Sequence, residues 1–154
     1  GQPVPRAPEE CLIDLQIEAH IPDDYIESLS GRLDAYRKIA AISTKAEGLD
    51  LLDEFIDRYG DPPKAIQGLI TVALTRNMAG RAGVTEITQR KDVLMIYVKT
   101  ATVEQIQALV AAFRGRVSVN GSSEKPFIAI KLVPNDKPVE IMQKAVAIMA
   151  GESE

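Results

Sequence analysis

The spacing of hydrophobic residues along the chain changes from a strand period to a helical period and then back again. Apolar and polar residues alternate from Cys11 to Ile17, which predicts one half-buried strand. Apolar residues then recur at helical spacing in three successive stretches, residues 29–43, 47–59 and 62–83, with short connections between them. We therefore expect an N-terminal helical layer after one strand.

The second half of the chain alternates between the two periods. The predicted elements are two strands within residues 84–98, a helix over 102–113, strands at 117–119 and 127–132, and a last helix from 136–138 onward. Thr102 and Gln105 have the spacing of a capping box, which fixes the start of the first of these helices. Strand pairs interleaved with helices predict an α+β fold with a mostly antiparallel sheet and helices.

The chain of 154 residues has the length of one domain, and we expect a single α+β domain over residues 11–150. Residues 1–10 contain Pro3, Pro5 and Pro8 and are expected to form a linker or an expression remnant, while residues 151–154 are expected to form a disordered tail. A start at Gly1 rather than methionine indicates a processed or excised piece.

The most clearly determined helix spans residues 47–59. At about 100° per residue, its apolar residues form one arc, which we expect to face the core: Leu49, Leu52, Phe55, Ile56 and Tyr59. Four carboxylates gather on the opposite side: Asp50, Asp53, Glu54 and Asp57. Gly60 and the sequence Asp61-Pro62-Pro63 then end this helix and start the next.

The charge of this helix is unusual for the chain. Residues 47–61 contain six acids and one base, a net charge of −5, whereas the whole chain carries −4. A solvated helix face commonly relieves such repulsion with lysines four residues away, but only Arg58 is available here. A plain solvated face remains one interpretation, and a docking surface for a basic partner is the other.

Motifs for catalysis are missing from the sequence. We find no phosphate-binding loop, dinucleotide fingerprint, paired-cysteine motif or nucleophile elbow, and His20 has no histidine or cysteine near it in sequence. We therefore expect no catalytic, cofactor or metal site and interpret Cys11 as a small buried hydrophobe. The alternative is an acidic metal-binding domain, or a small stand-alone enzyme, that uses the carboxylates of residues 50–57.

The sequence also argues against nucleic acid and membrane partners. The chain lacks tryptophan and is 5% aromatic, and its bases are scattered: Arg76, Arg81, Arg90, Lys91, Arg114 and Arg116. We therefore expect no direct binding to nucleic acid. No apolar run approaches the roughly 18 residues that span a bilayer, and we expect a cytoplasmic protein without membrane contact.

Three segments closely resemble, in order and spacing, the C-terminal domain of bacterial transcription-repair coupling factor (Mfd). They are Ile21-Pro22-Asp23-Asp24-Tyr25-Ile26, then Arg32-Leu33-Asp34-Ala35-Tyr36-Arg37-Lys38-Ile39-Ala40, and Glu54-Phe55-Ile56-Asp57-Arg58-Tyr59-Gly60-Asp61-Pro62-Pro63. The resemblance covers residues 11–83, and extends further by length and order of elements. It implies a parent that is an ATP-dependent DNA translocase, which displaces stalled RNA polymerase and recruits nucleotide-excision repair. The ATPase motifs of such a parent are absent from this chain.

The resemblance also implies a role for the acidic helix. In the family, this domain packs against a UvrB-like N-terminal module and masks the surface that binds UvrA, so it is autoinhibitory. Glu54 and Asp57 match the family's docking acids, which pair with arginines of the masked module, and Asp50 and Asp53 are expected to assist them. Phe55 and Tyr59 replace the family's usual leucine and phenylalanine, and residues 75–81 are less basic than the family pattern.

Overall fold

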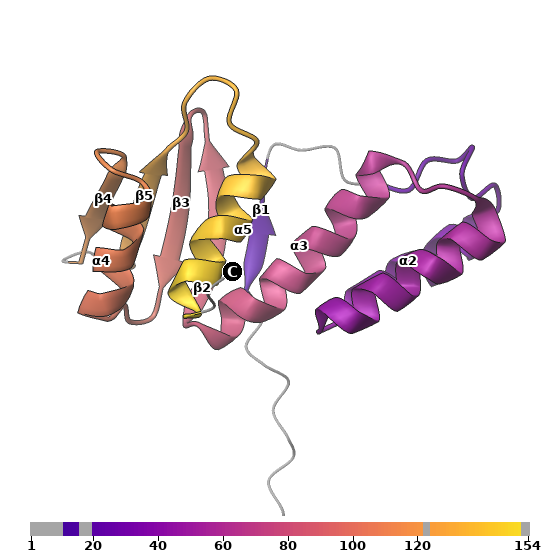
Figure 1. Cartoon of the computed structure of the whole chain (residues 1–154), viewed down its shortest axis with the longest axis horizontal. Coiled ribbons are helices and arrows are strands. Elements are labelled where there is room, and N and C mark those ends of the chain that lie inside the picture. The colour runs from indigo at the N-terminus through magenta and orange to yellow at the C-terminus, as the bar shows by residue number, and fades with distance from the viewer. Residues whose placement is uncertain (1–10, 16–19, 122–123, 152–154) are drawn as a thin grey trace, which may run out of the picture. The chain divides into compact units, whose positions relative to one another are not determined.

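The computed structural model describes residues 11–15, 20–121 and 124–151. Contacts divide the chain into two compact units, which we call the helical unit (Ile17–Leu74) and the sheet unit (Gly1–Gln16 with Thr75–Glu154). The elements are β1 (Leu12–Asp14), α1 (Leu29–Ala41), α2 (Lys45–Tyr59), α3 (Lys64–Arg81), β2 (Val84–Arg90), β3 (Val93–Val98), α4 (Val103–Ala112), β4 (Val117–Asn120), β5 (Phe127–Lys131) and α5 (Pro138–Met149) (Figure 1). The predicted α+β fold class is confirmed.

Side-chain caps fix the ends of the helices in the helical unit. The backbone N–H of Gly31 donates to Ser28 Oγ at 3.0 Å, and that of Glu47 donates to Thr44 Oγ1 at 3.1 Å. Because Thr44 is the N-cap, α2 begins at Lys45, two residues before the start expected from hydrophobic spacing. Gly60 ends α2 with a φ of 88°, a conformation that favours glycine.

The face of α2 that packs against the core differs from the expected one. Gly48, Leu51 and Phe55 are buried, whereas Leu49 and Ile56, which were expected in the core, are 63% and 44% exposed. The buried face is therefore rotated by roughly 50° from the predicted arc. The expectation was wrong for Leu49 and Ile56, although Phe55 is buried and Leu52 and Tyr59 pack against the core.

A close helix contact explains this rotation. A side chain on Gly48 would place its Cβ 3.3 Å from both Ile70 Cγ2 and Leu74 Cδ1 of α3. The bare backbone of Gly48 therefore packs against α3, and Leu51 enters the core beside Phe55. Because a glycine contributes nothing to a hydrophobic pattern, the spacing of apolar residues alone predicts the wrong centre for the buried face of α2.

The sheet unit contains one five-stranded sheet of order β1-β2-β3-β5-β4. β1 is parallel to β2 and the other neighbouring pairs are antiparallel, which confirms the predicted mostly antiparallel sheet. Leu94 and Ile96 of β3 lie opposite Ile130 and Ile128 of β5, and all four side chains are fully buried. Figure 1 shows α4 and α5 on the same side of this sheet.

The capping box of α4 is present as predicted. Gln105 N–H donates to Thr102 Oγ1 at 3.1 Å, and Thr102 N–H donates to Gln105 Oε1 at 2.9 Å. The amide of Gln105 also donates to the carbonyl oxygen of Met149 at 2.8 Å, so this residue ties the start of α4 to the end of α5.

Two leucines of α2 provide a direct test of the observed packing. Leu51→Ala should lower the free energy of unfolding by about 2–5 kcal/mol, because it removes buried methyl groups and leaves a cavity. Leu49→Ala should change it by less than about 0.5 kcal/mol, because that side chain is already in solvent. Urea denaturation of the two variants measures the difference, and equal losses would contradict the observed orientation of α2.

Candidate functional site

The acidic face of α2 lies opposite its buried face. Asp50, Asp53 and Asp57 are exposed and make no hydrogen bond or ion pair within the described part of the chain. Their spacing places them within about 60° of one another around the helix axis. Three carboxylates without an internal counterion therefore point away from the core of the helical unit.

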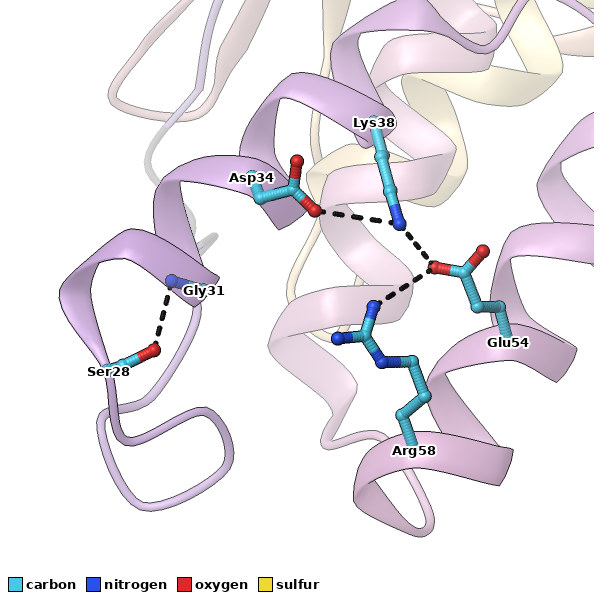
Figure 2. A network of polar contacts seen from close by, with 6 residues as sticks. All are labelled: Ser28, Gly31, Asp34, Lys38, Glu54 and Arg58. Carbon is cyan, nitrogen blue, oxygen red and sulfur yellow. Dashed lines mark hydrogen bonds and ion pairs between the residues drawn. The ribbon is translucent and has the colours of Figure 1, made fainter.

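Glu54, the fourth carboxylate, is in a different position because cations hold it. Lys38 Nζ of α1 lies 2.7 Å from Glu54 Oε2, and Arg58 lies 3.8 Å from the same oxygen (Figure 2). Lys38 also lies 3.5 Å from Asp34, one turn earlier on α1. The hydrogen bond with Glu54 raises the pKa of Lys38 above its ordinary value, so the ammonium remains charged at neutral pH.

The network extends from the surface toward the core. The guanidinium carbon of Arg58 lies 5.2 Å from the centre of the Tyr59 ring, and that ring packs beside Phe55 with its centroid 6.3 Å away. Tyr25 Oη donates to the carbonyl oxygen of Gly60 at 2.8 Å, which anchors the end of α2. Arg58 thus lies between Glu54 and packed aromatic rings, whereas Lys38 reaches Glu54 from α1.

Lys38 is the neighbour of Glu54 that the sequence reasoning missed. It comes from a different helix, 16 residues before Glu54, so no local spacing connects the two. The available signal was the pair Asp34 and Lys38 at i,i+4, together with the short link between α1 and α2, which makes the two helices neighbours.

Glu47 contributes to the charge of the segment but not to this surface. Its Oε1 accepts hydrogen bonds from Ser43 Oγ at 2.9 Å, Ser43 N–H at 3.2 Å and Thr44 Oγ1 at 3.2 Å. The hydrogen bond from the Ser43 side chain is the main reason that the pKa of Glu47 is lowered from 4.5, with further bonds to Ser43 and Thr44 adding to it. Glu47 therefore caps α2, and only part of the −5 counted from the sequence is available to a partner.

Exposed apolar side chains border the carboxylates. Leu49 and Ile56 follow one strip of the helix with Asp53 between them, at spacings of four and three residues. We call the set Leu49, Asp50, Asp53, Glu54, Ile56 and Asp57 the α2 surface. Interfaces commonly combine apolar and charged groups, so an acidic face with an exposed apolar edge is suited to binding a protein.

We also searched the described residues for metal sites, membrane spans and a reactive cysteine. No group of three or more His, Cys, Asp or Glu side chains that could hold a metal occurs among the described residues. Among those residues, no helix is both long and apolar enough to cross a membrane. Cys11 is buried, as expected, and burial raises the pKa of its thiol to about 11, which disfavours the reactive thiolate.

The cap on α2 gives a pH-dependent prediction. Because the folded-state pKa of Glu47 is depressed, its contribution to stability is present above the unfolded-state value and is lost as pH falls through the folded-state value. Glu47→Gln should therefore lower the urea midpoint at pH 7, and the difference from the wild type should shrink as the pH falls below 4.5.

A matched control for this prediction is Glu104→Gln. Glu104 lies exposed in the first turn of α4 and makes no hydrogen bond in the described segments. Its substitution should have a smaller effect at pH 7. A Glu47→Gln midpoint that stays equally far below the wild type at low pH would contradict the hydrogen-bonded carboxylate.

Sequence comparisons identify a family model and several relatives that are similar to this chain. The family model described as TRCF domain matches residues 15–109. A transcription-repair-coupling factor from Mycobacterium bovis is 41% identical over 90 residues, and one from Bacillus subtilis is 36% identical over 87 residues. These matches cover 57% and 56% of this chain but only 7% of each relative, so the chain spans a small part of their length.

A solved structure is similar in fold. It is described as the C-terminal domain of transcription-repair coupling factor, with a TM-score of 0.81 and 20% sequence identity. The match covers 95% of this chain and 92% of that one. The likeness therefore includes the sheet unit as well as the helices.

Proposed function

This chain belongs to the TRCF domain family, and we propose that it is a non-catalytic regulatory domain of a transcription-repair coupling factor. Its α2 surface would dock on the UvrB-like N-terminal module of the same parent chain. That contact would mask the surface through which the module binds UvrA, and would keep the factor autoinhibited until the contact opens. RNA polymerase and UvrA would then be partners of the parent rather than of this domain.

The observation that carries the proposal is the composition of the α2 surface. Asp50, Asp53 and Asp57 are exposed without a counterion among the residues that the structure describes, and Leu49 and Ile56 are exposed beside them. Arginines on a partner would supply the missing charge, and an apolar patch on the partner would cover the two hydrophobic side chains.

The two preferred acids would contribute in different ways. Asp57 is exposed and can meet an arginine without giving up another contact. Glu54 already shares one oxygen, Oε2, between Lys38 and Arg58, so a partner arginine would add to an existing network. Exposed ion pairs contribute about 0–1 kcal/mol each, so several together with apolar contacts would give a contact that holds but can still be released.

Charge reversal in the parent factor tests the proposal. The double variant Glu54→Lys, Asp57→Lys should increase UvrA binding, because it repels the arginines and uncovers the masked surface. A second pair, Asp53→Lys with Asp57→Lys, leaves the Lys38 contact intact and should act in the same direction. UvrA capture by immobilised parent protein measures both.

The matched control reverses Asp23 and Asp24, which are also exposed acids of the helical unit but lie outside α2. This control should leave UvrA binding unchanged. Direct titration of the isolated chain with the N-terminal module should show weaker affinity for Leu49→Ala as well as for Asp57→Asn. Unchanged UvrA binding in both α2 variants would refute the proposed docking of the α2 surface.

A further inference from the structure

Four of the bases that are scattered in the sequence meet at one end of the sheet: Arg90, Lys91, Arg114 and Arg116. β2 ends at Arg90, β5 ends at Lys131, and β4 begins one residue after Arg116. β3 lies between β2 and β5, and β4 lies beside β5, with each neighbouring pair antiparallel. The ends of β2 and β5 and the start of β4 therefore lie at the same end of the sheet. Figure 1 shows the β2–β3 turn, the α4–β4 turn and the connection from β5 to α5 together at that end.

The sheet register aligns three of these bases. Arg90 lies opposite Val93, Val93 lies opposite Lys131, and the backbone N–H of Lys131 donates to the carbonyl oxygen of Arg116 at 2.9 Å. These residues therefore form a row across four strands. The turns on either side add three more bases, and we call the whole set the basic end: Arg90, Lys91, Arg114, Arg116, Lys131 and Lys137.

Few acids compensate the basic end. Arg116 pairs with Asp136, but the other five bases are exposed and make no ion pair within the described residues. Asp92 and Glu140 are the remaining carboxylates of the adjoining turn and helix start. Residues 75–151 contain eleven bases and six acids, so this part of the chain is positive although the whole chain carries −4.

The surface is also hollowed. Lys91, Asp92, Lys131 and Asp136 line a depression of about 630 Å³ between the β2–β3 turn and the segment that leads to α5. Of its two carboxylates, Asp136 pairs with Arg116, so the two lysines of the lining outnumber the one carboxylate that is not in an ion pair among the described residues.

The chemistry of the basic end favours a duplex over a single strand. Tyr97 and Phe127 pack edge to face with their ring centroids 5.8 Å apart, but they lie at the opposite ends of β3 and β5, and Lys125 covers the Tyr97 ring. Phe113, the ring beside Arg116, is only 2% exposed. The described part of the basic end therefore presents no exposed ring on which unpaired bases could stack. The distance from β2 to β4 is about 14 Å, along which a DNA duplex carries about eight phosphates.

We infer that the basic end binds the phosphate backbone of double-stranded DNA without reading its sequence. This differs from the expectation of no direct nucleic acid binding, which rested on the scatter of the bases in the sequence and on the few aromatic residues. The inference uses the sheet unit only and is independent of the α2 surface. It predicts electrostatic binding that weakens steeply with salt.

The test measures fluorescence anisotropy of a short labelled DNA duplex titrated with the isolated chain. The variant Lys91→Asn, Lys131→Gln, Lys137→Gln removes three bases, and asparagine suits the positive φ of 55° at residue 91. Affinity at low salt should fall by roughly tenfold or more, and the slope of log affinity against log salt should decrease by about 2 to 3.

The control Lys45→Gln, Lys64→Gln, Arg81→Gln removes the same charge from exposed positions outside the basic end and should retain most of the affinity. Circular dichroism checks that both variants fold. Three outcomes would overturn the inference. The wild type does not bind the duplex, or the control variant loses as much affinity as the test variant. The third outcome is tighter binding of a single-stranded oligonucleotide or polyglutamate than of the duplex.

Discussion

The packing of α2 through Gly48, Leu51 and Phe55 decides what the helical unit presents to solvent. An amphipathic helix can bury only one side, so fixing the contact at Gly48 also fixes which carboxylates are exposed. A rotation of roughly 50° moves Leu49 and Ile56 out of the core and to the edge of the acidic face. The exposed apolar strip is thus a consequence of a close contact on the other side of the helix.

Orientation of the carboxylates follows from the same packing. Since α1 and α2 are joined by a short connection, Lys38 can reach Glu54, and Arg58 is kept near it by the Tyr59 ring. In the proposed docking, binding at Glu54 would therefore need little additional ordering of that side chain, whereas the aspartates would lose rotamer freedom. The surface combines a preorganised acid with three more adaptable ones.

Most helices and strands could be predicted from the sequence because each has a local signal. Thr102 with Gln105, Gly60 and Pro138 mark ends that the structure confirms, and alternation identified the core strands around Ile96 and Ile128. The buried face of α2 could not be predicted, because Gly48 has no side chain and the contact depends on α3. Lys38 beside Glu54, and the row from Arg90 to Arg116, depend on which elements become neighbours, and a single sequence does not encode that information locally.

The charge of the whole chain is a poor guide to its partners. A net charge of −4 and an isoelectric point near 5.1 would by themselves argue against binding a polyanion. Yet salt screens charges beyond about 8 Å under physiological conditions, a distance shorter than the α2 helix of 15 residues. A partner therefore responds to the local surface it touches.

The two proposed binding surfaces also differ in the interactions they offer. The α2 surface includes apolar groups, whose contribution to binding does not depend on screening, whereas binding at the basic end would be almost entirely electrostatic. Rising salt should consequently weaken contacts at the basic end much more than contacts at the α2 surface.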